Sequence, residues 1–174
     1  MARPRSITDA RILEVARQVF IEHGAGVSTQ VIADELGVSQ ATLFKRFGTK
    51  QCLLRSALMP QGFQSVQDHL AGGPDDRPIE TQLLEVATVL NDFFTTMVPA
   101  VATLANAGVH PAELVAQEHQ VHPALILHGA IADWFRRAME RGLIRRGNPW
   151  ALASMFAGAL KSRPFLSHVS DGSI

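Results

Sequence analysis

Polar and basic side chains gather in one short stretch of the chain. Gln40 and Thr42 carry donor and acceptor groups that suit the exposed edges of nucleic-acid bases. Lys45 and Arg46 follow on the same predicted helix and Lys50 lies just beyond it, where cations suit phosphate groups. These residue types predict a surface that reads bases and neutralises the phosphates beside them.

Two short helices joined by a tight turn are expected to position these side chains. The first begins at Ser28 or Thr29, where free backbone N–H groups and hydroxyls can bind another phosphate. It ends before Gly37, which supplies the backbone freedom of the turn, and Ser39 caps a second helix that runs to about Arg46. The core between the helices comprises Ile32, the small Ala33, Leu36, Val38, Leu43 and Phe47. This is helix-turn-helix organisation, in which the second helix projects into the major groove of DNA.

Residues 8–58 resemble the TetR-type (tetracycline-repressor-like) transcriptional regulators. The resemblance is carried by an ordered set: Ala10 to Phe20, Ser28-Thr29, Ile32-Ala33, Leu36 to Ser39, Thr42 to Phe44, Phe47, Lys50 and Leu53-Leu54. It implies that Thr29 grips a phosphate, that the helix from Gln40 to Arg46 reads the groove, and that Lys50 contacts the DNA backbone. The expected DNA-binding residues are Arg3, Arg5, Ser28, Thr29, Ser39, Gln40, Ala41, Thr42, Phe44, Lys45, Arg46 and Lys50.

Phe44 departs from the family pattern, because that position usually holds tyrosine and this chain has no tyrosine. A phosphate hydrogen bond worth about 1 kcal/mol is then expected to be lost. The ring of Phe44 either contacts a thymine methyl group or only packs within the protein.

Composition agrees with a globular protein. The chain has 174 residues, of which 47% are hydrophobic and 18% are charged, enough for a substantial core. The net charge is zero, but residues 1–58 hold eight Lys or Arg against five acids, a surplus of +3. One cysteine excludes an intrachain disulfide and a zinc site built from thiolates alone. Because no apolar run reaches the ~18 residues of a membrane span, we expect a cytoplasmic protein.

Spacings of three and four between apolar residues predict an all-α fold. We expect a three-helix DNA-binding domain over residues 5–58, with the helix-turn-helix at about 29–48, and a helical regulatory and dimerisation domain over 59–174. The expected helices cover about 8–23, 29–36, 39–46, a stretch from 49 to a kink or stop at Pro60, 79–99, 122–141 and 148–164. Pro99 and Pro164 are expected to end two of them. The helix from residue 49 is expected to enter the second domain and to transmit motion to it.

The resemblance implies a homodimer that binds a palindromic operator. The expected dimer face lies on the last helix and comprises Trp150, Ala151, Met155, Gly158, Leu160 and Phe165. Family members usually contribute two long helices each to a four-helix interface. Since little chain follows Pro164, the second of these helices is expected to be missing or very short.

A small effector is expected to bind within the second domain and to control the DNA affinity of a repressor. The expected pocket residues are apolar: Phe93, Phe94, Met97, Leu104, Leu127, Ile131, Trp134 and Phe135. They favour an apolar or aromatic ligand over a multiply charged one. The same side chains also fit ordinary core packing at helical spacing.

Other classes of function stay open at this point. Control by a partner protein, by metal or by redox chemistry is an alternative to control by a small effector. His110, His119, His122 and His128 form only a loose cluster without metal-binding spacing, so no metal or cofactor is expected. Cys52 is expected to be buried and inert. An all-helical enzyme is the remaining alternative, but no phosphate loop, nucleophile elbow or paired acidic motif supports catalytic residues.

Overall fold

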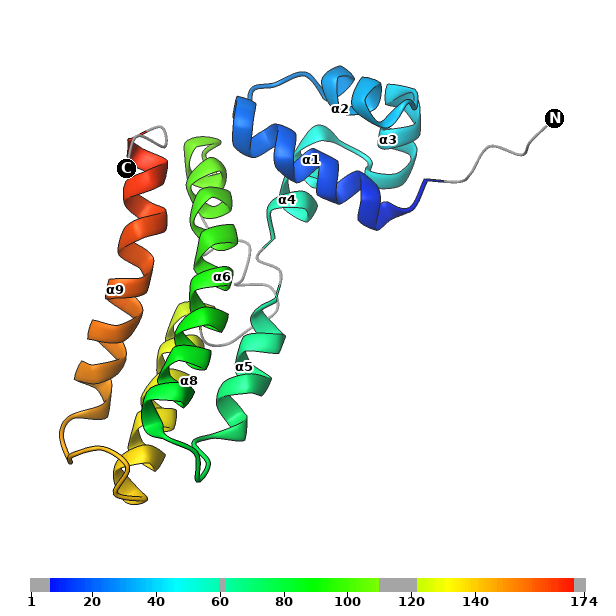
Figure 1. Ribbon diagram of the computed structural model, residues 1–174. Helices are drawn as coiled ribbons and strands as arrows, with labels where there is room; N and C mark the ends of the chain where they lie inside the picture. The colour runs from blue at the N-terminus through cyan, green and yellow to red at the C-terminus, as the bar shows by residue number, and fades with distance from the viewer. Residues whose placement is uncertain (1–6, 60–61, 110–121, 171–174) are drawn as a thin grey trace. The chain divides into compact units, whose positions relative to one another are not determined.

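The computed structural model describes residues 7–59, 62–109 and 122–170, which are helical and contain no strand (Figure 1). Its helices are α1 (Asp9–His23), α2 (Thr29–Leu36), α3 (Gln40–Phe47), α4 (Lys50–Leu58), α5 (Phe63–Gly72), α6 (Ile79–Asn106), α8 (Pro123–Glu140) and α9 (Pro149–Val169). They form two compact units. The first contains the described residues of Met1–Met59 and Ala100–Leu114, and the second those of Pro60–Pro99 and Val115–Ile174. The expected all-α class is confirmed.

Side-chain caps fix where the helices of the first unit begin. Thr8, Ser28, Ser39 and Thr49 each precede a helix, and each hydroxyl accepts a hydrogen bond from a backbone N–H of the first turn. Asn148 does the same at the start of α9, where its Oδ1 lies 2.9 Å from the N of Trp150. Such caps satisfy donors that a helix terminus leaves without an internal partner.

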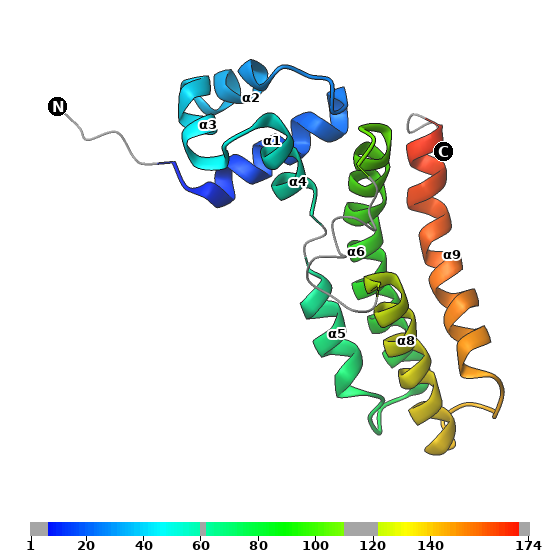
Figure 2. The same ribbon diagram turned by 180° about the vertical axis from the view of Figure 1, so that it is seen from behind.

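The first unit is a small helical domain around one core. Helices α1 and α4 pack together, and α2 and α3 pack against them (Figure 2). Ile12 and Phe20 of α1 and Leu53 of α4 are fully buried in this core. The end of α6 adds Ala100 and Leu104, both also fully buried. The core of the DNA-binding unit therefore includes side chains that are distant in sequence.

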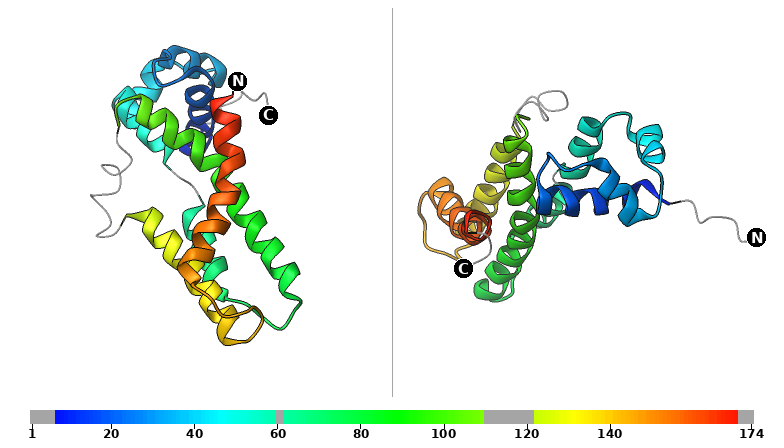
Figure 3. Two further views of the ribbon diagram at one scale, coloured as in Figure 1. Left: turned by 90° about the vertical axis from the view of Figure 1, so that its left-hand side faces the viewer. Right: turned by 90° about the horizontal axis from the view of Figure 1, so that it is seen from above.

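The second unit is a helical bundle made of α5, the first part of α6, α8 and α9. Helices α8 and α9 lie side by side and are joined by a short turn (Figure 3). Aromatic rings fill much of its core, with Trp134 and Phe135 in edge-to-face contact at 5.5 Å between ring centroids. Such ring contacts add to the stabilisation that comes from burying apolar area.

Two prolines lie inside helices, so the expected helix ends at these residues are wrong. Pro99 lies within α6, which continues to Asn106, and Pro164 lies within α9, which continues to Val169. A proline removes one backbone donor and clashes with the preceding turn, but it does not stop a helix that is held by packing on both sides. Beyond Pro99, the buried Ala100 and Leu104 supply that packing.

α4 ends at Leu58 within the first unit, in agreement with the expected stop near Pro60, so the expectation that this helix enters the second domain is wrong. Pro60 itself lies outside the described residues. The sequence analysis missed α5, whose buried Val66 and Leu70 face the core of the second unit. The last two helices, α8 and α9, have 18 and 21 residues.

By length and composition α6 could cross a membrane, but its apolar residues have another role. Val86 and Leu90 are buried in the core of the second unit. Ala100 and Leu104 are buried in the core of the first. Core packing therefore accounts for the buried apolar residues of this helix.

Candidate nucleic-acid interface

The turn between α2 and α3 has the geometry that the sequence predicts. Gly37 adopts the left-handed conformation at φ 64° and ψ 31°, and its N–H donates to carbonyls of the last turn of α2. The N–H of Val38 donates to the carbonyl of Ala33 at 2.9 Å. Glycine adopts this conformation without the steric penalty that a Cβ brings. The chain therefore leaves α2 and enters α3 within a few residues.

Apolar contacts hold α3 rigidly against the rest of the first unit. Ile32 and Ala33 of α2 and Leu43 of α3 have no exposed surface. Leu36, Val38 and Phe47 are partly buried against the same core. Complete burial of Leu43 fixes which side of α3 faces inward, because side chains on a helix advance by about 100° per residue.

The side of α3 opposite Leu43 is exposed and polar or basic. Ala41 and Lys45 are exposed, Thr42 is half-buried, and Lys50 lies half-buried at the first position of α4. The structure thus places the expected groove-facing residues on one surface. The cationic side chain of Lys50 lies beside this surface. A helix held in this way can place short side chains against base edges in a major groove.

Some expected DNA-binding side chains already have partners within the protein. Thr29 is only 3% exposed, and its Oγ1 accepts a hydrogen bond from Gln40 Nε2 at 2.6 Å. Ser39 and Thr42 share a hydroxyl hydrogen bond of 2.9 Å. These contacts join α2 to α3 and close the first turn of α3. The sequence analysis did not foresee them, because spacing does not show which polar groups meet across a turn.

Arg46 is also held by the protein. Its guanidinium lies 2.9 Å from Asp9 Oδ1 and donates to the backbone carbonyl of Ile7, so the end of α3 is tied to the start of α1. Phe44 is half-buried, and Ser28 is exposed at the start of α2. The remaining two expected contacts, Arg3 and Arg5, lie outside the described residues.

Arg17 fixes the end of α4 within the first unit. Its guanidinium donates to the carbonyls of Ala57 and Met59, each at 3.3 Å. These carbonyls belong to the last turn of α4 and its C-terminal cap, where acceptors lack helical partners. Burial lowers the pKa of Arg17.

Cys52 is exposed, so the expectation that it is buried is wrong. The inward positions of α4 are occupied by Leu53, Leu54, Ala57 and Leu58. Cys52 comes directly before this set and faces outward.

The expected pocket residues divide between the two units. Leu104 lies in the core of the first unit and therefore does not join the others. The remaining seven lie in or against the core of the second unit: Phe93, Phe94, Met97, Leu127, Ile131, Trp134 and Phe135. Lys161 of α9 lies 5.6 Å from the centre of the Phe94 ring and is the cation nearest to this aromatic group in the described contacts.

The expected dimer face on α9 is mostly exposed. Trp150, Met155 and Phe165 are 52%, 70% and 57% exposed, which is high for large apolar side chains. Ala151 and Gly158 are also exposed, whereas Leu160 packs against the core of the second unit.

The described histidines have structural contacts. Nδ1 of His122 accepts from the backbone N of Ala124 at 3.1 Å and caps α8. His128 stacks on Trp150 at 5.1 Å, and its Nε2 lies 3.1 Å from Ser154 Oγ. His110 and His119 lie outside the described residues. Within the described ranges, no group of three or more His, Cys, Asp or Glu side chains is arranged to hold a metal ion.

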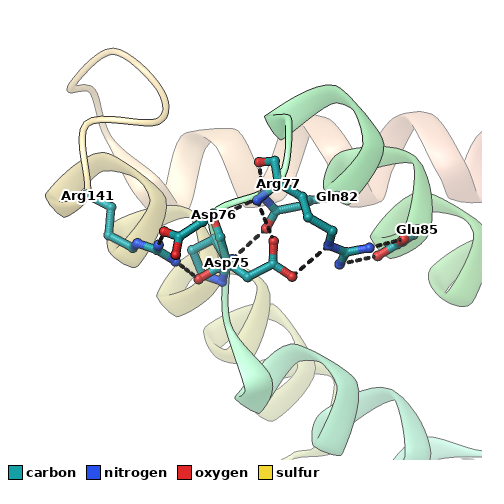
Figure 4. A network of polar contacts seen from close by, with 7 residues as sticks. Asp75, Asp76, Arg77, Gln82, Glu85 and Arg141 are labelled. Atoms are coloured by element: carbon teal, nitrogen blue, oxygen red, sulfur yellow. Dashed lines mark hydrogen bonds and ion pairs between the residues drawn. The ribbon is translucent and has the colours of Figure 1, made fainter.

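A polar network joins the connection between α5 and α6 to the first turns of α6 and to the C-cap of α8 (Figure 4). Arg77 pairs with Asp75 at 2.8 Å and with Glu85 at 2.6 Å. The backbone N–H of Arg77, followed by its guanidinium, lowers the pKa of Asp75, and the guanidinium lowers the pKa of Glu85. Gln82 is buried and bonds the backbone of the same loop. Arg141 of α8 reaches this loop through Asp76. The network holds the α5–α6 connection and is distant in sequence from the helix-turn-helix.

The core of the first unit, its glycine turn and the exposed basic helix define a helix-turn-helix DNA-binding protein. Residues 12–57 match the sequence pattern of the family described as bacterial regulatory proteins, tetR family. Residues 12–57 therefore form a helix-turn-helix domain of the tetR type, which confirms the resemblance found in the sequence.

Similar proteins cover nearly the whole chain. The uncharacterised HTH-type transcriptional regulator YvkB of Bacillus subtilis (strain 168) is 27% identical over 154 residues, which are 86% of this chain and 77% of that protein. GusR of Salmonella enterica has a TM-score of 0.63 and 18% identity, covering 98% of this chain and 91% of its own. The TetR-family regulator PfmR of Thermus thermophilus has a TM-score of 0.59 and 20% identity, covering 91% of this chain and 95% of its own. The two structures show a shared fold.

Proposed function

We propose that this regulator is a cytoplasmic homodimer that represses transcription from a palindromic operator and releases it when a small apolar effector binds. The tetR-type helix-turn-helix domain of residues 12–57 supports the DNA-binding part of this proposal. The proposal adds that the protein forms a homodimer, that it binds a small effector, and that it represses transcription.

The observation that carries the proposal is the exposed apolar stripe on α9. Met155, Phe165 and Val169 recur at helical spacing and are 70%, 57% and 63% exposed. A stable soluble monomer rarely leaves such a contiguous apolar surface in water. Leu125 of α8, which is 60% exposed, adds apolar surface on the neighbouring helix. A second copy of the chain is the occupant that fits, because two-fold interfaces bring the same patch of each subunit together.

A two-fold dimer also contacts more base pairs than the first unit of one subunit can contact alone. One recognition helix contacts only a few base pairs, too few to select one site. Two helices related by two-fold symmetry read half-sites about one DNA turn apart, ~34–36 Å. The exposed Lys45 on each α3 then contributes to phosphate neutralisation on both half-sites.

An apolar effector is supported by the composition of the second unit's core. Phe93 and Phe94 lie 5.7 Å apart between ring centroids, and Trp134 and Phe135 form a second aromatic pair. Apolar and aromatic walls with few polar groups suit a hydrophobic ligand. The effector would lower operator affinity by favouring a dimer whose recognition helices are spaced wrongly for DNA.

Selection of bound duplexes from a random DNA pool tests the proposal. The wild-type protein is expected to enrich a palindrome with half-sites about one turn apart. A variant with Lys45→Ala and Lys50→Ala serves as the control and is expected to lose most of this enrichment. Enrichment of a single half-site by a monomeric protein would refute the homodimer, and no enrichment at low salt by a dimeric protein would refute specific DNA binding.

A further inference from the structure

The strongest unexplained contact at the DNA-reading surface joins Gln40 to Thr29. The Gln40 amide nitrogen donates to the Thr29 hydroxyl at 2.6 Å, across the turn that separates α2 from α3. Thr29 is 3% exposed, whereas Gln40 is half-buried at the first position of α3. The buried partner is therefore fixed, and it orients a side chain that stays accessible to DNA.

The bond changes what Gln40 can offer to a base. A glutamine amide has one carbonyl oxygen that accepts and one NH₂ group with two donors. Thr29 occupies one of the two donors. One N–H and the carbonyl oxygen remain, which is a donor beside an acceptor.

That remaining pattern complements one purine and not the other. In the major groove adenine presents the N7 acceptor beside the N6 donor, which one N–H and one carbonyl oxygen match. Guanine presents two acceptors, O6 and N7, and so needs two donors. A Gln40 side chain held by Thr29 has only one donor left for such a base.

We propose that Thr29 and Gln40 form a positioning pair that makes this regulator prefer adenine over guanine at one position of each half-site. Thr29 acts through Gln40 and not through a hydroxyl contact to phosphate. The proposal rests on the DNA-binding function and deepens it by assigning a base preference. The proposal also gives the buried hydroxyl of Thr29 a role in DNA recognition. This role needs no direct contact between the hydroxyl and a phosphate.

Replacement of Thr29 by valine removes the hydroxyl while keeping the shape of the side chain. Operators are selected from a random duplex pool with the wild-type protein, Thr29→Val, Thr29→Ser and Gln40→Ala. Affinity for the selected operator, for its single adenine-to-guanine variants and for a scrambled duplex is then measured at several salt concentrations. Thermal unfolding of each variant confirms that the comparison concerns folded protein.

The wild-type protein is expected to favour adenine over guanine by about tenfold at one half-site position, the effect of one good base contact. Thr29→Val is expected to reduce this preference to within about twofold, and Thr29→Ser to restore it. Gln40→Ala is expected to lose the preference at the same position, and adding Thr29→Val to it should change nothing further. The dependence of affinity on salt should be the same in Thr29→Val and wild type, because no phosphate contact is removed.

Two outcomes would overturn the inference. A uniform loss of affinity in Thr29→Val with a shallower salt dependence would show that Thr29 holds a phosphate. An unchanged base preference in Thr29→Val would show that the pair does not set specificity. Both differ from a failure of the proposed function, in which the wild-type dimer itself would select no operator.

Discussion

Replacement of Met155 by aspartate is expected to separate the homodimer into monomers. Met155 is 70% exposed on α9 and is the first residue of the apolar stripe that we assign to the dimer interface. Complete burial of a methionine side chain contributes about 1.5–3 kcal/mol. Burial of its exposed part then contributes about 1–2 kcal/mol for each subunit.

Two-fold symmetry doubles this effect, because each dimer loses the same side chain twice. Loss of the apolar contact alone weakens dimerisation by about 2–4 kcal/mol, a factor of roughly 30 to 1,000 in the dissociation constant. The introduced carboxylates add a desolvation cost. Analytical ultracentrifugation over a range of protein concentrations measures the constant for both proteins.

Leu84→Asp provides a matched control. Leu84 of α6 is 69% exposed, nearly the same fraction as Met155, but it lies on a different helix from the stripe. The control is expected to dimerise like the wild-type protein. The assignment of the interface is refuted when Met155→Asp dimerises as tightly as the wild type, or when both variants lose dimerisation to the same extent.

Three further predictions concern stability. Leu43→Ala removes a side chain with no exposed surface, so chemical denaturation should show a loss of ~2–5 kcal/mol. Gly37→Ala places a Cβ at φ 64°, and denaturation should show a loss of ~1–2 kcal/mol, with a smaller loss for Gly37→Asn. The pKa of Glu85 is lowered by the guanidinium of Arg77, and that of Asp75 is lowered first by the backbone N–H of Arg77 and then by its guanidinium, so the stability that these carboxylates contribute should be lost as the pH falls through the lowered pKa values. Replacement of the Arg77 side chain removes the guanidinium contacts and keeps the backbone N–H. Denaturation midpoints measured across acidic pH should show a weaker dependence in Arg77→Gln, and an equal dependence would contradict this account.

Local signals in the sequence predicted most helix starts correctly. Thr8, Ser28, Ser39 and Asn148 are capping residues whose chemistry acts within one helical turn, and the structure places each at a helix start. The left-handed turn at Gly37 is equally local. Such features depend on a few neighbouring residues, so they are accessible without knowledge of the fold.

Helix ends depended on tertiary packing and were predicted less well. Pro99 and Pro164 have the local character of helix breakers, yet α6 and α9 continue past them. The residues Ala100 and Leu104 after Pro99 are buried in a core, whereas Phe165 after Pro164 is 57% exposed. The sequence did not predict α5, although Phe63, Val66 and Leu70 show helical spacing, because this short helix begins after Gly62 and ends at Gly72, and glycine is typical of loops.

The DNA-reading surface was predicted by residue type, but its internal contacts were not. The pair of Thr29 and Gln40 spans 11 positions, and the pair of Asp9 and Arg46 spans 37. No periodicity indicates which polar groups meet at such separations. Only the packing of the helices brings them together.

The division of α6 between two cores has a consequence for truncation. Ala100 and Leu104 complete the core of the DNA-binding unit, although they lie more than 40 residues after Met59. A fragment that stops at Met59 would keep the whole helix-turn-helix and lack part of the apolar interior that supports it. A fragment that ends at Met59 is therefore expected to be less stable than one that extends past Leu104.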